Sequence, residues 1–347
     1  MDLDQSRSAL TVVKHEPFNA EAPSDAFETS ITPTRFHFVR SNFALPVHDG
    51  LLAIGGAAGN PFTLTLDDLR RMPRHELVVT LECAGNARLG HTPLPTGEPW
   101  QSNAVSAARW SGVLLRTVLE KARPLDEAVA VGFEGADHGP YHEKADVHFA
   151  RSLPLELALD PSAEILIAYE MNGEPLNADH GAPFRLIVPG WYAVASVKWL
   201  ARINLLTQPF EGTFQTERYV YYWNDREAEP VSLMLPRAKI ATPANGTTLS
   251  EGSHTVRGKA WSGSGPITKI DVSLDGKDDW RAAEVEAPPG PYQWQDWSFV
   301  WQVRDAGRHT LRVRATDAAG NVQPESPRWN RLGYGNNAVE LVHVHVR

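Results

Sequence analysis

Hydrophobic and polar residues alternate in two different ways along the chain, and the pattern changes near residue 240. Before this point, near-continuous apolar runs are mixed with runs of helical spacing, which favours a fold that combines sheets with helices. Residues 76–81 form a near-continuous apolar run and predict a strand that is buried on both faces. Residues 165–169 and 184–188 predict two further strands. Asn172-Gly173 lies between apolar runs and predicts a hairpin turn.

Two helices are predicted in the same region. Residues 113–119 place apolar side chains at helical spacing directly after Ser111-Gly112, which supplies a helix start. Pro154 opens a second segment that runs to Ala158, because proline is favoured in the first turn of a helix.

Beyond residue 240 the pattern indicates a β-sandwich. Residues 242–246 have the composition of a linker with a turn, and apolar runs then recur at about ten-residue spacing. Residues 309–315 and 342–346 alternate polar with apolar side chains, while residues 275–276 and 320–321 predict turns. Six of the 11 tryptophans lie in this last third, and they predict an aromatic core or an aromatic contact surface: Trp261, Trp280, Trp294, Trp297, Trp301 and Trp329.

These patterns divide the chain into three parts. Residues 1–34 are polar and predict an extended N-terminal arm, and residues 36–40 predict a first short strand. We expect an α+β protein, with a mixed α/β domain over residues 35–238 and a β-sandwich over residues 239–347. A chain of 347 residues is comfortable for two domains.

Composition and charge exclude several classes of protein. Hydrophobic residues make up 42% of the chain and charged residues 22%, as in an ordinary soluble globular protein. The net charge of −9 argues against a nucleic-acid partner. No apolar stretch approaches the roughly 18 residues of a membrane span. Residues 1–5 lack a basic segment followed by an apolar run, so a cytoplasmic location is expected, or a periplasmic one if a leader has been removed.

The single cysteine, Cys83, is the main candidate for chemistry. It excludes an internal disulfide, and it lies at the end of the apolar run 76–81, where a side chain is well placed to line a site. Gly85-Asn86 predicts a sharp turn that returns Arg88 to the thiol, where its charge would stabilise the thiolate. Taken alone, a free cysteine is more often a packed core residue.

The sequence around Cys83 carries a more specific signal. Glu82-Cys83-Ala84-Gly85-Asn86-x-Arg88 resembles the signature of the sulfite oxidase family, in which the cysteine thiolate binds molybdenum. The resemblance covers nearly the whole chain from about Arg35, because further segments follow in the family's order: 110–113, 169–176, 180–185, 188–190 and 196–200. Several motifs in register are a strong signal, whereas one short pattern is weak.

The resemblance implies a molybdopterin-binding domain followed by an immunoglobulin-like domain that forms a homodimer. It implies one molybdenum–molybdopterin cofactor per chain, with Cys83 as the protein ligand of the metal, since a thiolate suits a sulfur-rich centre. The implied cofactor-binding residues are Phe38, Arg40, Asn42, Cys83, His180, Arg185, Ser196 and Lys198. The implied catalytic residues are Cys83 and three arginines that hold an oxyanion, namely Arg40, Arg88 and Arg331, the last offset by one position from the family's pattern.

The implied reaction is the oxidation of sulfite to sulfate by oxygen-atom transfer at molybdenum. One cysteine cannot form a Cys-x-x-Cys-His haem attachment, and no flavin module fits the remaining length. We therefore expect neither haem nor flavin, and an external electron acceptor such as a cytochrome c. Two alternatives stay open: another reaction of the same cofactor (nitrate reduction, sulfoxide reduction or oxidation of a sulfane sulfur), or a non-enzymatic binding protein.

Some positions depart from the family's pattern and bear on the substrate. Phe149 stands where vertebrate and plant sulfite oxidases have a tyrosine, and His148 or Tyr141 are the candidates to replace that hydroxyl. Ala195 stands where many members have an arginine. The segment 137–146 is also unlike the vertebrate enzymes.

The histidines of the chain allow a second metal hypothesis. His138, His142 and His148 lie close in sequence, but their spacing does not fit a tight zinc motif and partner cysteines are absent. We favour loop histidines near the mouth of the active site. His343 and His345 share one face of a predicted strand, and that face is expected to be exposed.

Overall fold

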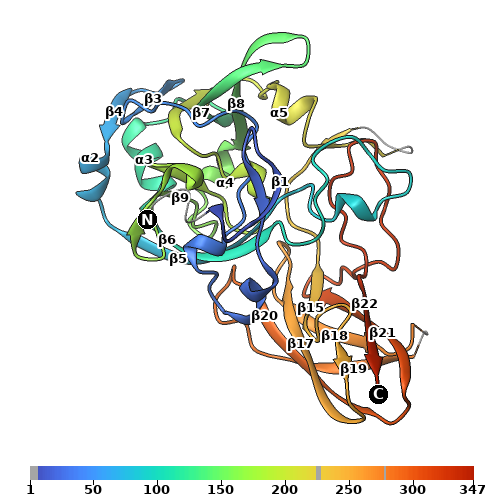
Figure 1. Ribbon diagram of the computed structural model, residues 1–347. Helices are drawn as coiled ribbons and strands as arrows, with labels where there is room; N and C mark the ends of the chain where they lie inside the picture. Colours follow the sequence, from blue (N-terminus) through green and yellow to red (C-terminus); the bar gives the residue numbers. More distant parts are fainter. Residues whose placement is uncertain (1–6, 224–227, 277–278) are drawn as a thin grey trace.

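Two five-stranded sheets form the first part of the molecule (Figure 1). The computed structural model describes residues 7–223, 228–276 and 279–347. One sheet has the order β10-β9-β6-β5, with β11 paired to β9, and comprises β5 (His75–Glu82), β6 (Val105–Leu114), β9 (Leu166–Met171), β10 (Glu174–Pro175) and β11 (Arg185–Ile187). The other has the order β4-β3-β12-β7-β8 and comprises β3 (Leu51–Gly56), β4 (Phe62–Thr65), β7 (Ala130–Tyr141), β8 (Lys144–Pro154) and β12 (Leu200–Leu206).

Short helices connect these strands. The α-helices are α2 (Leu66–Arg70), α3 (Leu115–Ala122), α4 (Leu155–Leu159) and α5 (Thr213–Thr216). The 3-10 helices are η1 (Ser24–Glu28), η2 (Thr34–Phe36), η3 (Arg88–Gly90), η4 (Ala178–His180) and η5 (Ala193–Ala195). Helix α3 buries Leu115, Val118, Leu119 and Ala122, which share one face at helical spacing. Among the described residues, every helix is too short or too polar to cross a membrane.

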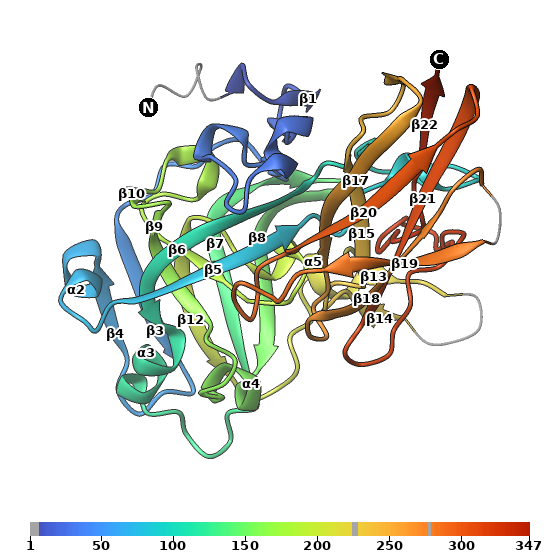
Figure 2. The ribbon, with the colours of Figure 1, turned by 90° about the horizontal axis from the view of Figure 1, so that it is seen from below.

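The last part of the chain is a β-sandwich that stands beside the two five-stranded sheets (Figure 2). Its strands follow the order β15-β17-β20-β19-β18-β21-β22-β16 and enclose a core that includes Val256, Trp297 and Leu311. Their bounds are β15 (Arg237–Thr242), β16 (Thr248–Leu249), β17 (Gly252–Trp261), β18 (Ile267–Ser273), β19 (Trp280–Val285), β20 (Gln295–Val303), β21 (Gly307–Asp317) and β22 (Leu341–Val346). Between the two parts, β13 (Val220–Tyr221) pairs with β14 (Glu229–Pro230). The expected fold class, α+β with a C-terminal sandwich, is confirmed.

Most predicted elements are present, and three differ for identifiable reasons. Helix α3 begins at Leu115, whereas residues 112–114 continue β6 because they pair with β9; tertiary pairing here overrides local helical spacing. Residues 36–40 form no regular strand, since Val39 alone makes a bridge, to Ala20. Residues 242–246 are not a linker between domains but the turn after β15 inside the sandwich. The domain boundary placed after residue 238 falls within β15 and stays a prediction.

The N-terminal arm is folded rather than extended. Strands β1 (Thr11–Lys14) and β2 (Asn19–Glu21) form a hairpin, and η1 follows it. Ala22 and Phe27 are buried, so the arm contributes apolar side chains as well as polar ones. The prediction was wrong because the few apolar residues of a polar segment are enough to dock it when the body offers a complementary surface.

Buried aromatic and charged side chains join the sandwich to the first part. Trp261 and Trp294 pack in the core cluster of the first part of the molecule and not in the core cluster of the sandwich. Trp261 Nε1 donates a 2.9 Å hydrogen bond to Glu82 at the end of β5. Arg237 lies 3.6 Å from the same carboxylate and also pairs with Glu340. The aromatic residues of the last third thus serve a contact surface as well as a core.

Candidate active site

Cys83 lies at the point where β5 ends and the chain turns. Its backbone N–H donates to Ala104 O at 2.8 Å, and its carbonyl accepts from Asn86 N at 2.8 Å, which closes the turn. The side chain is buried. Burial raises the pKa of the Cys83 thiol, while the positive charges of Arg40 and Arg88 act in the opposite direction. A bound metal ion would displace the thiol proton, as it does at other thiolate ligands.

Two cavities meet at Cys83. We call the first the deep cavity; it runs from Cys83 to Arg185 and Lys198. The second, the open cavity, runs from Cys83 to Arg88 and Arg218. The residues that line both cavities are Arg40, Asn42, Cys83 and Tyr219. A group bound in one cavity would therefore meet a group bound in the other at Cys83.

The deep cavity brings together all the residues predicted to bind the cofactor: Phe38, Arg40, Asn42, Cys83, His180, Arg185, Ser196 and Lys198. They come from segments far apart in the sequence. Arg185 donates to the carbonyls of His180 and Ser196 at 3.1 and 2.9 Å, and Lys198 donates to Ser41 Oγ at 2.8 Å. Arg40 Nη2 donates to Asn42 Oδ1 at 2.6 Å. The role of each residue stays a prediction, but their convergence is a property of the fold.

The charged groups of the deep cavity are strongly affected by burial. Burial lowers the pKa of Arg185 to about 9 and lowers that of Lys198, which the charge of Arg185 also lowers. Burial also lowers the pKa of His37 to about 3 and holds that of His180 well below its usual value, so both imidazoles are neutral at pH 7. The protein thus holds buried cations whose charge is costly without an anion nearby.

A phosphate-bearing pterin fits this cavity. His37 and Asp137 both line the cavity. Their atoms His37 Nε2 and Asp137 Oδ1 are buried and have no hydrogen-bond partner among the described residues. Buried polar atoms of this kind normally have a partner. A ligand with hydrogen-bonding edges would satisfy them, and an anionic group would neutralise Arg185 and Lys198.

Arg88 is held close to Cys83 by two glycines and by the sandwich. A Cβ atom at Gly85 would lie 2.5 Å from Arg88 Nη1, and one at Gly97 would lie 2.9 Å from its Cζ. The guanidinium donates to Glu98 O at 2.8 Å and to Leu332 O at 3.2 Å. The predicted return of Arg88 to the thiol is therefore observed, and it depends on residues without side chains.

The open cavity is lined by Tyr141 and His142, which the sequence analysis had named, and by Arg218, Tyr219 and Tyr334, which it had not. Arg218 donates to His142 Nε2 and lies over the ring of Tyr141, with 5.8 Å between its Cζ and the ring centroid. Tyr219 stacks on Tyr334 with 5.0 Å between centroids. Arg218 and Tyr219 follow α5, and nothing in their sequence pattern distinguishes them from other surface residues.

The C-terminal arginine predicted for the site, Arg331, is not in it. Its side chain is exposed and lies over the ring of Tyr222, 4.1 Å from the centroid, and it lines neither cavity. The one-position offset explains the error, since the next residue, Leu332, reaches the open cavity and holds Arg88 through its carbonyl. The sandwich therefore contributes to the site through a main-chain carbonyl and Tyr334, while the third arginine of the open cavity is Arg218.

The hairpin β7–β8 carries Phe149 and the two side chains that could replace the missing tyrosine hydroxyl, His148 and Tyr141. Phe149 is buried against Phe214, at 4.8 Å between centroids, and lines the deep cavity without a hydroxyl. His148 points to the opposite, exposed face, so it cannot replace that hydroxyl. Tyr141 at the tip of the hairpin lines the open cavity. Of the two candidates, Tyr141 alone has access to the site.

Known proteins match both parts of the chain. Residues 44–214 match the family model described as oxidoreductase molybdopterin binding domain, and residues 232–347 match the Mo-co oxidoreductase dimerisation domain. The mitochondrial sulfite oxidase of Homo sapiens is 38% identical over 97% of this chain, which spans 66% of the human protein's length. The sulfite oxidase of Gallus gallus is 36% identical, with 93% of this chain and 75% of that protein covered.

Other matches carry different names. An NADH nitrate reductase of Solanum lycopersicum is 32% identical over 99% of this chain and 42% of its own length. The crystal structure of the sulfane dehydrogenase SoxCD from Paracoccus pantotrophus has a TM-score of 0.82 and 28% identity, with 93% of this chain and 83% of that chain covered. The fold, the converging cavity residues and the two matched family models agree. The chain belongs to the sulfite oxidase family of molybdenum-cofactor oxidoreductases.

Proposed function

We propose that this protein oxidises sulfite to sulfate and passes the electrons to an external acceptor. The balanced reaction converts sulfite and water into sulfate, two protons and two electrons. The observation that carries the proposal is the position of Cys83, where a cavity fitted to a pterin meets a second cavity lined by Arg40, Arg88 and Arg218. Fixed guanidinium groups are well suited to a small oxyanion.

In this proposal the deep cavity holds the cofactor. Arg185, Lys198 and His180 bind the pterin and its phosphate, and the Cys83 thiolate is the protein ligand of the metal. When bound, the molybdenum cofactor supplies oxygen-atom transfer and two-electron redox chemistry.

The open cavity binds and orients the substrate. Arg88 is fixed by two main-chain carbonyls, so its charge faces the anion without a rearrangement of the side chain. Arg218 lies between Tyr141 and His142 and adds positive charge to the same cavity. The buried phenol of Tyr334 lies beside Arg88, with 5.2 Å between Cζ and the ring centroid. Together these groups attract sulfite and exclude water from its surface.

The acceptor and the assembly are part of the same proposal. One cysteine cannot form the Cys-x-x-Cys-His attachment of a c-type haem, and in this proposal the electrons leave to a separate acceptor such as a cytochrome c. The match of residues 232–347 to a dimerisation domain supports a homodimer formed through the sandwich.

Steady-state kinetics test the proposal. We expect the molybdenum-loaded protein to reduce ferricyanide and cytochrome c with sulfite as the donor, and size-exclusion chromatography with light scattering to give a dimer mass. Absence of sulfite-dependent reduction in protein that contains about one molybdenum per chain would overturn the substrate assignment.

A second reaction of the same cofactor is favoured by two observations. Phe149 leaves the deep cavity without a hydroxyl at that position, and the structural match to a sulfane dehydrogenase covers nearly the whole chain. Thiosulfate or a protein persulfide as donor, and nitrate as acceptor with reduced viologen, are therefore assayed beside sulfite. A kcat/KM for either substrate that exceeds the value for sulfite would transfer the proposal to that substrate.

A further inference from the structure

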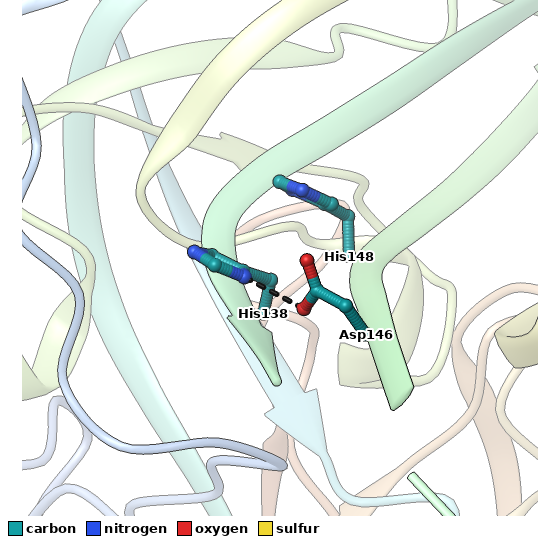
Figure 3. Close-up of side chains that lie close together, drawn as sticks. All are labelled: His138, Asp146 and His148. Carbon is teal, nitrogen blue, oxygen red and sulfur yellow. Dashed lines mark hydrogen bonds and ion pairs between the residues drawn. The ribbon is translucent and has the colours of Figure 1, made fainter. Parts of the chain in front are cut away.

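The outer face of the β7–β8 hairpin carries a side-chain cluster that the active site does not use (Figure 3). His138, Asp146 and His148 each offer one ligand atom, and these atoms all lie within 4.8 Å of one another. His138 and His148 are opposite each other in the register of the two strands. Asp146 precedes His148 by two residues and therefore shares its face. Among residues 7–223, 228–276 and 279–347, no other three His, Cys, Asp or Glu side chains gather this closely.

We propose that this cluster binds a divalent transition-metal ion of the zinc type. Two imidazoles and a carboxylate are ligands that Zn²⁺, Cu²⁺ and Ni²⁺ accept, whereas Mg²⁺ and Ca²⁺ favour sets made of oxygen alone. Three protein ligands leave a fourth position of a tetrahedral ion for water. The sequence-based objection, that partner cysteines are absent, does not apply to a site built from histidine and aspartate.

The three side chains already lie against one another, and the two rings would rotate out of their stack to direct one nitrogen each at a shared ion. The rings of His138 and His148 stack with 4.6 Å between centroids and an interplanar angle of 11°. His138 Nδ1 lies 2.8 Å from Asp146 Oδ1. Glu134 Oε1 lies 3.9 Å from His148 Nδ1, which places a second carboxylate next to a ligating ring. Carboxylates in such positions orient histidine ligands and raise their basicity.

The strand register explains why the cluster forms on this face. Side chains of the hairpin alternate, so Asp137 and Phe149 point into the deep cavity while His138 and His148 point outwards. His142, which the sequence grouped with these two, lies at the tip and lines the open cavity instead. The third ligand, Asp146, was missed because a histidine search does not detect it.

A metal ion here would cross-link a weak part of the hairpin. The register of the ladder shifts between Glu134 and His138, and again between Gly139 and Tyr141. Pro140 has no N–H to donate to the ladder. The ion would bridge the strands between these two irregularities, a few residues before the tip that carries Tyr141. Metal binding would therefore order the segment that lines the open cavity.

Isothermal titration of the chelator-treated holoenzyme with ZnCl₂ tests the site. We expect one zinc ion per chain and no binding of MgCl₂. His138→Gln and His148→Gln should each weaken the zinc affinity by about tenfold or more, and Asp146→Asn by less. With CuCl₂, the electron paramagnetic resonance spectrum should show coupling to two nitrogen donors in the wild type and to one in His148→Gln.

Matched controls separate this site from scattered surface histidines. His343 and His345 lie on one face of β22, and the double variant His343→Gln/His345→Gln should bind zinc as the wild type does. His142→Gln should also keep the affinity. Amide hydrogen exchange over residues 136–149 should slow when zinc is added. No zinc binding by the wild type, or an unchanged affinity in His138→Gln and His148→Gln variants of native circular dichroism, would overturn the proposal.

Discussion

The deep cavity and the open cavity share Cys83 but hold their charged side chains in different ways. In the deep cavity, Arg185 is buried and donates to two main-chain carbonyls. In the open cavity, Arg218 is half-buried and is held by the side chains of His142 and Tyr141. Main-chain partners cannot be changed by substitution, whereas side-chain partners can. Arg88 shares the main-chain anchoring of Arg185, so Arg218 is the cation of the open cavity whose position depends on side chains that a substitution can replace.

The largest expected effect comes from the residue that both cavities share. Cys83→Ser replaces a soft thiolate with a hydroxyl of similar shape, so we expect turnover to fall at least about a hundredfold, since even indirect changes to metal ligands cost 10–100-fold. Circular dichroism should show an unchanged fold. Sulfite turnover within tenfold of the wild type, at full molybdenum content, would show that Cys83 is not the ligand.

One pair of substitutions separates the two cavities directly. Lys198→Met removes a buried cation of the deep cavity and should weaken cofactor binding by about tenfold or more, measured as molybdenum and pterin per chain. Arg88→Met removes a cation of the open cavity and should raise KM for sulfite by a similar factor at normal molybdenum content. If both variants lose cofactor equally, the division between the cavities is wrong.

The ion pairs of Glu340 with Arg237 and Lys239 are expected to affect stability and not substrate binding. Burial alone would raise the pKa of Glu340, but Lys239 and Arg237 outweigh it and lower that pKa to about 2. A depressed carboxyl pKa stabilises the fold above its ordinary value of 4.5, and this contribution is lost as pH falls from about 4.5 towards 2. Glu340→Gln should therefore cost about 2 kcal/mol at pH 7 and flatten the acid limb of the stability curve, since about a quarter of the side chain is exposed.

Urea unfolding from pH 7 to pH 3 measures this effect in the wild type and in Glu340→Gln. The difference between the two proteins should shrink as the pH falls, because the wild-type carboxylate is progressively protonated. KM for sulfite should not change. A difference that stays constant over this pH range would contradict the assigned charge of Glu340.

The smallest expected effect comes from Arg218, which lines the open cavity, and it is compared with the effect of Arg331, which the resemblance implied for the site. Arg218→Met should raise KM for sulfite about fivefold, which corresponds to about 1 kcal/mol for a partly exposed charge. The increase should be smaller at high salt. Arg331→Met is the matched control, because its guanidinium lies over Tyr222 and lines neither cavity. An effect of Arg331→Met equal to that of Arg218→Met would restore the sequence-based assignment.

A site residue could be predicted from the sequence when it lies within a recognisable motif, and not when the folding of separate loops brings it to the site. The resemblance to the family named four residues of the deep cavity before the fold was known, because the segments 180–185 and 196–200 carry His180, Arg185, Ser196 and Lys198. The open cavity depends on where long side chains from loops converge, and no local pattern encodes that convergence. Arg218 was missed for this reason. Arg331, which the resemblance implied, lines neither cavity, while the carbonyl of the next residue, Leu332, accepts from Arg88.

The fold shows the same division. Strands with clear apolar runs, such as β5, were predicted, because their burial follows from their own residues. The extent of β6 and the packing of the arm depend on partners elsewhere in the chain, which local spacing does not describe. The cluster on the β7–β8 hairpin could be predicted only in part. Alternation places His138 and His148 on the same face of the hairpin, but the strand register is needed to place them opposite each other.

The hydrogen bond from Trp261 to Glu82 has a consequence for how the protein unfolds. Glu82 belongs to the strand that ends at Cys83, while its partners Trp261 and Arg237 belong to the sandwich. If the sandwich were cut away, the buried Glu82 side chain would lose Trp261 and Arg237 and keep only its hydrogen bond from Asn86, which is strongly unfavourable. The two halves should therefore melt in one transition. A fragment that ends before β15 should not fold alone, and in the intact chain tryptophan fluorescence and far-ultraviolet circular dichroism should report one coincident transition.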